Sequence, residues 1–446
     1  MGLNAEPLLA HLRRFAFASV HAFPILGWGG AELWRRFRKL QAVDVSYGPH
    51  GADLFVFAGE IPVEWEEHTR SLFETVPLPR LAIWLRPDWR CEVPTGIPIA
   101  YVIESGAFHR LNWTDIRTRL LDPDNGVNKP LLADRPPAPW RGLGDHSQGG
   151  EGMMGGKPYG RPMAMTADDI DDLSLDDVPM ALGPHFPNLP SGLELELRVQ
   201  GDRIRTVEAV RNHFPVVNID ANGSLQTKVG IVNWLTLAAL RGEPVRIADL
   251  ERARVCSHLA WMADFLALSG RDSVARRFRH AFDDALVAAR VGDIAKLIRR
   301  AEWGGLQQQL RGVGVTDAKE AARLNLTGPV ARASGLARDG RAKDPAYQAL
   351  DFAIQTETAG DSWARWRVRA RECVQSMELI RRAGETLSEA PPEGPRGESS
   401  KNADGLRTPT TANLAALKAH LFTLEWFEAL LFIASLDLDM QEAALR

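Results

Sequence analysis

The sequence is poor in cysteine. Only three of its 446 residues are cysteine, Cys91, Cys256 and Cys373, and no two of them form a C-x-x-C pair. This scarcity excludes a disulfide framework and any zinc or iron–sulfur site whose ligands lie close together in the sequence. A reducing, cytosolic setting fits such cysteine usage best.

The sequence also lacks a long hydrophobic run. Arg13-Arg14 precedes the mostly apolar stretch 15–26, as in a targeting signal, but His21 and Pro24 interrupt that stretch and no small-residue cleavage site follows. It is shorter than the roughly 20 residues that span a bilayer. The apolar run 430–434 predicts a buried strand at most. We expect that the chain does not cross a membrane by itself.

A strong charge of either sign is missing as well. The formal net charge is −4, which gives no reason to invoke nucleic acid or an anionic membrane surface as a partner. The length predicts two or three folded units, each large enough to bury a core. Tryptophan, in contrast, occurs 13 times, which indicates broad apolar interfaces in addition to a core.

Residues 1–121 alternate strand and helix patterns. The apolar run 54–58 is typical of a strand buried in a parallel sheet, and 64–75 predicts the helix that follows it. This order predicts a doubly wound parallel α/β domain, in which ligands sit beyond the carboxyl ends of the strands. The other expected elements are a helix at 31–40 and strands at 42–46, 80–85 and 98–103.

A linker and a second domain follow. Residues 122–180 are rich in glycine, proline and methionine and then acidic, which predicts a flexible linker. Residues 181–446 form the second domain, which opens with a β-hairpin, because 193–199 alternates apolar and polar residues and 204–210 returns after a turn. We predict an α+β, mainly helical domain with this hairpin at its start.

Helical patterns fill most of the second domain. Before the longest one, Thr316 is expected to cap a short helix that Gly328-Pro329 ends, with Arg332 in the turn beyond it. Asp361 is expected to start a long amphipathic helix. Residues 391–407 are expected to be a polar, disordered insertion. The other expected helices are 225–240, 247–269, 273–289, 294–309 and 409–423.

The central part of the second domain resembles a known family. Gly-Val-Gly-Val at 312–315, Leu-Thr-Gly-Pro at 326–329, Arg-Ala-Ser-Gly at 332–335 and Gly360-Asp361 before an Arg-rich helix resemble the quinone-facing large subunit of respiratory complex I. They equally resemble the large subunit of the related membrane-bound, energy-converting (group 4) nickel–iron hydrogenases. The run from Glu251 through Arg254 to His258 is similar to the Glu-x-x-Arg-x-x-x-His of that family's core helix.

Residues 1–121 resemble the small iron–sulfur subunit of the same enzymes. The stretch from His21 to Glu32 is similar to its cysteine-bearing loop, and 51–59 to its second strand. The resemblance therefore implies a small and a large subunit fused through the linker.

The resemblance also implies where metal ligands would lie. The cluster ligands would fall on Gly27, Gly30, about Asp88 and about Ser105. A cluster needs four anionic soft ligands, normally thiolates, and glycine offers no side chain. The nickel–iron ligands would fall on Val229, Val232, Asp439 and Glu442, where isopropyl groups and carboxylates replace thiols. We therefore expect no cofactor, no metal and no hydrogen activation.

Five residues are candidates for a pocket. In complex I the hairpin turn that starts at Gly-Pro carries a histidine of the quinone pocket, but here that position falls near Pro190, with His185 displaced. Glu251, Arg254 and His258 share one helix face and could form either a proton-relay cluster or a buried ion-pair network that fixes helix packing.

The remaining candidates carry charge. Arg332, with the charged loop 338–341, could line a pocket or an interface, or lie in solvent. Asp439 and Glu442 could carry protons or a hard cation, or belong to an exposed acidic tail.

These observations predict a redox-silent subunit that docks or couples within a membrane-bound, ion-translocating complex. Its partners would be membrane subunits that resemble complex I or antiporter-like proteins, in a hetero-oligomer on the inner face of the cell membrane. We expect no catalysis by the chain alone. One alternative is an oxidoreductase subunit that keeps a pocket for quinone or another organic acceptor, with electrons from a partner. Another is an accessory factor that mimics the mature large subunit during assembly.

Overall fold

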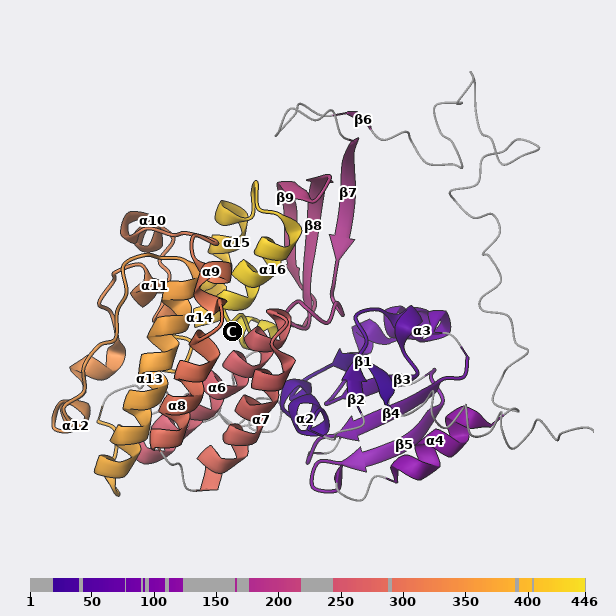
Figure 1. Cartoon of the computed structure of the whole chain (residues 1–446), viewed down its shortest axis with the longest axis horizontal. Helices are drawn as coiled ribbons and strands as arrows, with labels where there is room; N and C mark the ends of the chain where they lie inside the picture. Colours follow the sequence, from indigo (N-terminus) through magenta and orange to yellow (C-terminus); the bar gives the residue numbers. More distant parts are fainter. Residues whose placement is uncertain are drawn as a thin grey trace, which may run out of the picture.

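The computed structural model of the chain places two bodies side by side, a parallel-sheet unit within residues 20–121 and a helical unit that carries a small antiparallel sheet (Figure 1). One apolar core runs across both, since Trp28 and Trp65 of the first body pack on Phe214 of the second with ring centroids 5.0 and 4.8 Å apart. The structure describes residues 19–39, 43–76, 78–89, 91–92, 96–108, 112–122, 165–166, 176–217, 244–287, 291–389, 393–402 and 405–445.

The first body is a five-stranded parallel sheet with helices on both faces. Its strand order is β2-β1-β3-β4-β5. On one face, α2 and α4 pack against Leu54 and Val56, while α3 packs against Phe55 and Phe57 on the other. The predicted α/β class is confirmed. The elements are β1 (Val20–Leu26), α2 (Gly30–Phe37), β2 (Val43–Val45), β3 (Leu54–Ala58), α3 (Glu66–Thr75), β4 (Leu81–Arg86), β5 (Ile99–Glu104) and α4 (Trp113–Leu121).

Strand β1 was not predicted, although it lies inside the sheet between β2 and β3. It occupies the end of the apolar stretch that imitates a targeting signal. Because the chain order reverses at β1 and β3, their carboxyl ends form the switch point at which open α/β sheets bind ligands. The loop 27–30 follows β1 at this place.

The second body begins with an antiparallel sheet in the order β6-β7-β8-β9. Strand β8 (Leu193–Gln200) turns through Gly201, whose φ is +61°, into β9 (Arg203–Asn212). The alternation seen in the sequence places one row of β8 side chains in the core. Residues 176–180, expected in the linker, belong instead to β7 (Asp176–Leu182), and β6 spans Met165–Thr166. The rest of the linker from residue 123 lies outside the described residues.

Four helices follow in sequence. They are α6 (Ile247–Leu268), α7 (Asp272–Val287), α8 (Val291–Glu302) and α9 (Leu306–Leu310). A single helix over 294–309 was wrong, because Gly304 and Gly305 adopt φ values of 90° and 92° that end α8. The helix expected at 225–240 lies outside the described residues.

The segment before the longest helix differs from the prediction at both of its caps. Asp317, not Thr316, caps α10 (Ala318–Arg323), since its carboxylate accepts a hydrogen bond from the Glu320 N–H. Gly328-Pro329 does not merely end a helix but begins α11 (Gly328–Ala333), with proline in the first turn where its missing N–H is harmless. Arg332 therefore lies on a buried helix rather than in a turn. Two short elements follow, a 3₁₀ helix at Gly340–Lys343 and α12 (Pro345–Gln348).

Helix α13 (Ser362–Ala383) starts where predicted, with the Asp361 carboxylate accepting from the Ala364 N–H. The prediction of a disordered segment at 391–407 is wrong for its described part, because β10 (Ser400–Asn402) pairs with β11 (Gly405–Arg407). The strand predicted at 430–434 is also wrong, since these residues lie in a helix, α16. The last helices are α14 (Pro409–Asn413), α15 (Ala415–His420), α16 (Trp426–Ser435) and α17 (Met440–Ala443).

Within the described ranges, none of the helices combines the length and apolarity needed to cross a bilayer.

Candidate functional site

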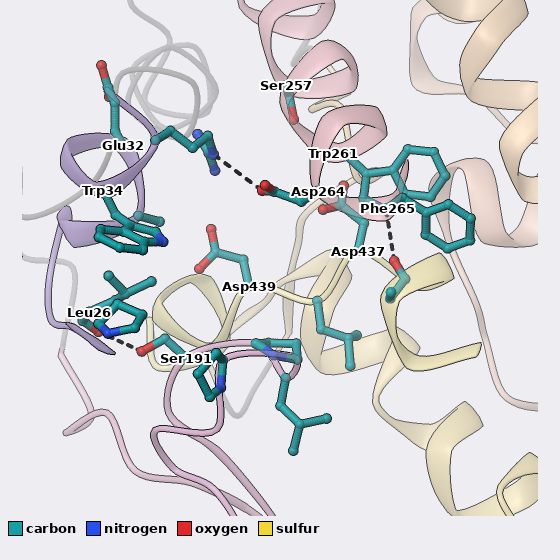
Figure 2. A pocket seen from close by; sticks show the side chains of 18 of the residues that line it. Leu26, Glu32, Trp34, Ser191, Ser257, Trp261, Asp264, Phe265, Asp437 and Asp439 are labelled. Atoms are coloured by element: carbon teal, nitrogen blue, oxygen red, sulfur yellow. Dashed lines mark hydrogen bonds and ion pairs between the residues drawn. The ribbon is translucent and has the colours of Figure 1, made fainter. Parts of the chain in front are cut away.

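A cavity of about 570 Å³ lies where the two bodies meet. Four segments line it: α2, the loop 185–191 before β8, α6, and the residues 433–441 that lead into α17. Figure 2 shows Trp34 of α2 and Trp261 and Phe265 of α6 around it, with Asp439 pointing between the two helices. A cavity of this size with aromatic walls and a few polar groups can hold an organic ligand.

Charged groups stand at its edge. The Arg38 guanidinium donates to Asp264 Oδ1 at 3.2 Å, and Arg35 lies 3.8 Å from the same carboxylate. These pairs join α2 to α6, so they also connect the two bodies. On the other wall, Ser191 Oγ donates to the Leu26 carbonyl at 2.6 Å. The cavity is thus enclosed by contacts between the bodies.

The loop 27–30 is packed too tightly to carry side chains at its ends. A Cβ added to Gly27 would lie 2.1 Å from the Glu60 carbonyl oxygen, and one added to Gly30 would lie 2.2 Å from the Ala58 carbonyl oxygen. Real Cβ atoms do not approach backbone this closely. The loop has therefore closed onto the residues that follow β3.

Gln441 holds this loop from the second body. Its amide Nε2–H donates to the Gly27 carbonyl at 3.1 Å, and its Oε1 accepts from the Gly29 N–H at 2.9 Å. We call this two-way contact the Gln441 clamp. Gln441 stands between Asp439 and Glu442, so the two segments that the resemblance assigns to metal ligands contact each other directly.

These residues do not fit an iron–sulfur cluster. Gly27 and Gly30 have neither a ligand atom nor space for one. Asp88 is exposed, whereas Ser105 is buried, and the nearby Cys91 is only half-buried. Among the described residues, no three His, Cys, Asp or Glu side chains are grouped as metal ligands.

The carboxylates near the C-terminus are buried around an arginine rather than exposed in an acidic tail. Arg396 lies 3.5, 3.4 and 3.8 Å from carboxylate oxygens of Asp437, Asp439 and Glu442. Asp439 caps α17 and lines the cavity, while Glu442 accepts from Thr410 Oγ1 at 3.0 Å. Burial raises the pKa of Glu442 to about 7, although Arg396 opposes this effect. Val229 and Val232 lie outside the described residues.

Arg332 is the centre of a buried charge network. Its Nη2 donates to Glu372 Oε1 at 2.5 Å and its Nη1 to Glu393 Oε1 at 2.6 Å, and Nη1 lies 3.2 Å from Asp339. Arg254 donates to the Gly394 carbonyl at 3.0 Å. We call this network, which is 0–3% exposed apart from Asp339 at 6%, the ionic core; its members are Glu251, Arg254, Arg332, Asp339, Arg341, Glu372 and Glu393.

His258 touches the ionic core through its Nε2, 3.1 Å from Glu372 Oε2. Burial lowers the pKa of His258 to about 4, so the ring is neutral near pH 7. Burial alone would raise the pKa of Glu372, but Arg332 and the hydrogen bond with His258 hold it well below its usual value. Burial raises the pKa of Glu393 to about 7. Glu251, Arg254, His258 and Arg332 thus join one network, and none of them lines the cavity.

His185 lies apart from that network, on the cavity wall. Its ring packs edge-on against Trp65 at 4.7 Å and lies 5.4 Å from His68. Neither ring nitrogen has a hydrogen-bond partner among the described residues. Burial lowers the pKa of His185 to about 3, so the imidazole is neutral. Of the five pocket candidates, it is the one beside the cavity.

Several functional positions escaped the sequence analysis. Gln441 and Arg396 gave no signal of their own, because each acts on residues far away in the chain. In α13 the polar residues Arg365, Arg369, Glu372 and Ser376 recur at helical spacing and are all fully buried. That polar stripe, one residue ahead of the apolar stripe, was a signal we did not use.

The comparisons with known proteins agree with the central part of the chain. Residues 273–428 match the family model described as "Respiratory-chain NADH dehydrogenase, 49 Kd subunit". A chloroplastic NAD(P)H-quinone oxidoreductase subunit of Glycine max is 27% identical over 274 residues, 48% of this chain and 70% of that protein. The NAD(P)H-quinone oxidoreductase subunit of the same letter from Prochlorococcus marinus (strain MIT 9303) is 26% identical over 292 residues, 51% and 74% of the two chains.

Among solved structures, a chain of the archaeal membrane-bound sulfane sulfur reductase, a respiratory membrane complex, aligns with 61% of this chain and 99% of its own length, at 18% identity and a TM-score of 0.48. The family assignment rests on the sequence matches. Over residues 273–428, this chain carries a domain of the complex I 49 kDa-subunit family.

Proposed function

We propose that this chain is a complex I-like subunit of a membrane-bound respiratory complex, and that it docks or couples within the complex without carrying electrons. The proposal rests on one observation above all, the closure of the loop 27–30 onto the backbone after β3. In this proposal the first body corresponds to the small iron–sulfur subunit, fused to its large partner, and its cluster has been replaced by packing and by the Gln441 clamp.

Similarity to subunits of NAD(P)H-quinone oxidoreductases motivates the proposed partners. These are membrane subunits that resemble those of complex I and antiporter-like proteins, on the inner face of the cell membrane. A coupling role draws support from the ionic core and from Glu442, because buried titratable groups can change charge when a neighbouring surface moves.

The test is purification of the native protein from detergent-solubilised membranes. We expect it to co-purify with membrane subunits. Because such partners can carry clusters of their own, iron, acid-labile sulfide and nickel are then measured on the isolated chain, where we expect none in stoichiometric amount. A free monomer after solubilisation would contradict docking, whereas stoichiometric iron and sulfide would contradict the redox-silent role.

A second candidate function is binding of a quinone or another organic acceptor in the cavity, with electrons supplied by a partner. The observation in its favour is the cavity itself, with Trp34, Trp261 and Phe265 on its walls and the unpartnered ring of His185 beside it. An aromatic wall and one neutral hydrogen-bonding group suit a flat, uncharged ring.

Quenching of tryptophan fluorescence by a short-chain quinone tests this candidate. Ser257→Trp should fill the cavity, since Ser257 lines it from α6, and should abolish saturable quenching. Ser273→Trp, at an exposed position of α7, is the matched control. Equal quenching in both variants would place the ligand elsewhere.

A further inference from the structure

Helix α8 carries a row of cations that ends in an exposed tryptophan. Lys296, Arg299, Arg300 and Trp303 follow one another at i, i+3, i+4 and i+7, which places them on one side of the helix. The opposite side is buried through Ile294, Ile298 and Ala301. The Lys296 side chain is 73% exposed, Arg299 and Arg300 are exposed, and Trp303 is 86% exposed. We call these four residues the α8 stripe.

The turn that holds Trp303 outward is built rather than loose. Gly304 and Gly305, both with left-handed φ, reverse the chain directly after it. The Arg271 guanidinium donates to the Gly304 carbonyl at 2.7 Å and so ties this turn to the start of α7. A tryptophan this exposed has no core to join, although its indole is the largest apolar side chain available.

The neighbouring helix extends the positive charge. Helices α7 and α8 lie side by side (Figure 1), and Arg276 and Arg277 of α7 are also exposed. Within the part of the chain that the structure describes, no ion pair joins Arg299, Arg300, Arg276 or Arg277 to a carboxylate; Lys296 alone approaches one, Asp293 at 3.8 Å. The net charge of −4 therefore conceals a locally basic face.

We propose that the α8 stripe docks on an anionic lipid surface. Exposed arginine and lysine side chains are attracted to acidic headgroups, and tryptophan favours the headgroup level, where its ring is half in apolar surroundings. A protein partner is less suited, because the centres of protein interfaces are depleted in charge and the stripe has a single apolar side chain. A basic face on an otherwise acidic molecule also orients it toward a negative plane.

This proposal does not rest on the proposed function, since the stripe and the cavity share no residue. The test is co-sedimentation of the full-length chain with vesicles of phosphatidylcholine alone or with one-third phosphatidylglycerol. We expect binding to the anionic vesicles only, and its loss as salt rises from about 0.05 to 0.5 M. R299E/R300E should weaken binding at least about tenfold, and Trp303→Ser should weaken it by a smaller factor.

The matched control is R381E/R382E, which makes the same charge change on two adjacent arginines in the last turn of α13. It should bind within about threefold of the wild type, because it leaves the stripe intact. Equal loss in the two double variants would overturn the proposal, since net charge alone would then explain binding. Wild-type protein that ignores anionic vesicles would also overturn it and leave an acidic protein as the occupant.

Discussion

The two segments that the resemblance assigns to metal ligands have taken opposite courses. In the loop 27–30 the side chains are absent, and backbone fills the space where they would lie. In the segment 437–442 carboxylates stand instead, buried around Arg396. One segment has become inert packing, while the other remains titratable, with Glu442 near neutrality. A lost site can thus be closed sterically or kept as charge, and only the second course leaves a group that can respond to its surroundings.

The largest effect is expected where charge is most deeply buried, in the ionic core. Arg332→Ala removes the cation shared by Glu372, Glu393 and Asp339, which leaves buried carboxylates without it. The free energy of unfolding should fall by about 3–5 kcal/mol, as measured by urea denaturation. Arg381→Ala, at an exposed site of α13, is the control and should change little. A loss no greater than in the control would show that the ionic core does not hold these helices together.

The closed loop should be the next most sensitive place. Gly30→Ala drives a methyl group into the Ala58 carbonyl, so the unfolding free energy should drop by about 1–3 kcal/mol. Gly48→Ala is the matched control, because nothing lies within 4 Å of the added Cβ there. Full tolerance of alanine at position 30 would mean that the loop has room for a ligand, and would weaken the contrast between the two segments.

The fold was more predictable than the site. Apolar runs located β3 to within a residue and β4 and β5 nearly so, because buried parallel strands are continuously apolar. The same rule failed at 430–434, where a continuous apolar run belongs to the buried helix α16; periodicity alone does not separate the two cases. In β1, His21 and Pro24 interrupted the run and concealed a central strand.

The site was less predictable because its contacts cross the chain. Glu251, Arg254 and His258 were identified as one face, and the buried-network alternative describes their surroundings. Their partners could not be named, however, since Glu372 pairs with His258 across 114 residues and Gln441 reaches Gly27 across 414. The polar composition of 391–407 predicted disorder, yet Glu393 and Arg396 of that segment are each held by buried ion pairs.

A pH titration sharpens the view of the segment that kept its charge. Burial raises the folded-state pKa of Glu442 to about 7 from 4.5, so folding favours the protonated form. The stability that this group contributes is present below pH 4.5 and is lost as the pH rises toward 7. In Glu442→Gln that loss disappears, and the variant should gain roughly 2 kcal/mol on the wild type between pH 4.5 and 7. Urea unfolding at a series of pH values measures the difference, and parallel curves would contradict a buried acid here.

The smallest effect is expected where the two segments meet, at the Gln441 clamp. Gln441→Ala deletes one donor and one acceptor, and the Gly27 carbonyl and Gly29 N–H lose their partners. Because these groups are only partly buried, the cost should be about 1–2 kcal/mol. Gln441→Glu separates the two bonds: a carboxylate still accepts from Gly29 but repels the Gly27 carbonyl. It should therefore be at least as destabilising as alanine. If glutamate instead restored wild-type stability, the clamp would hold the loop through Gly29 alone, and the closure of the loop would not depend on the segment that retains its charge.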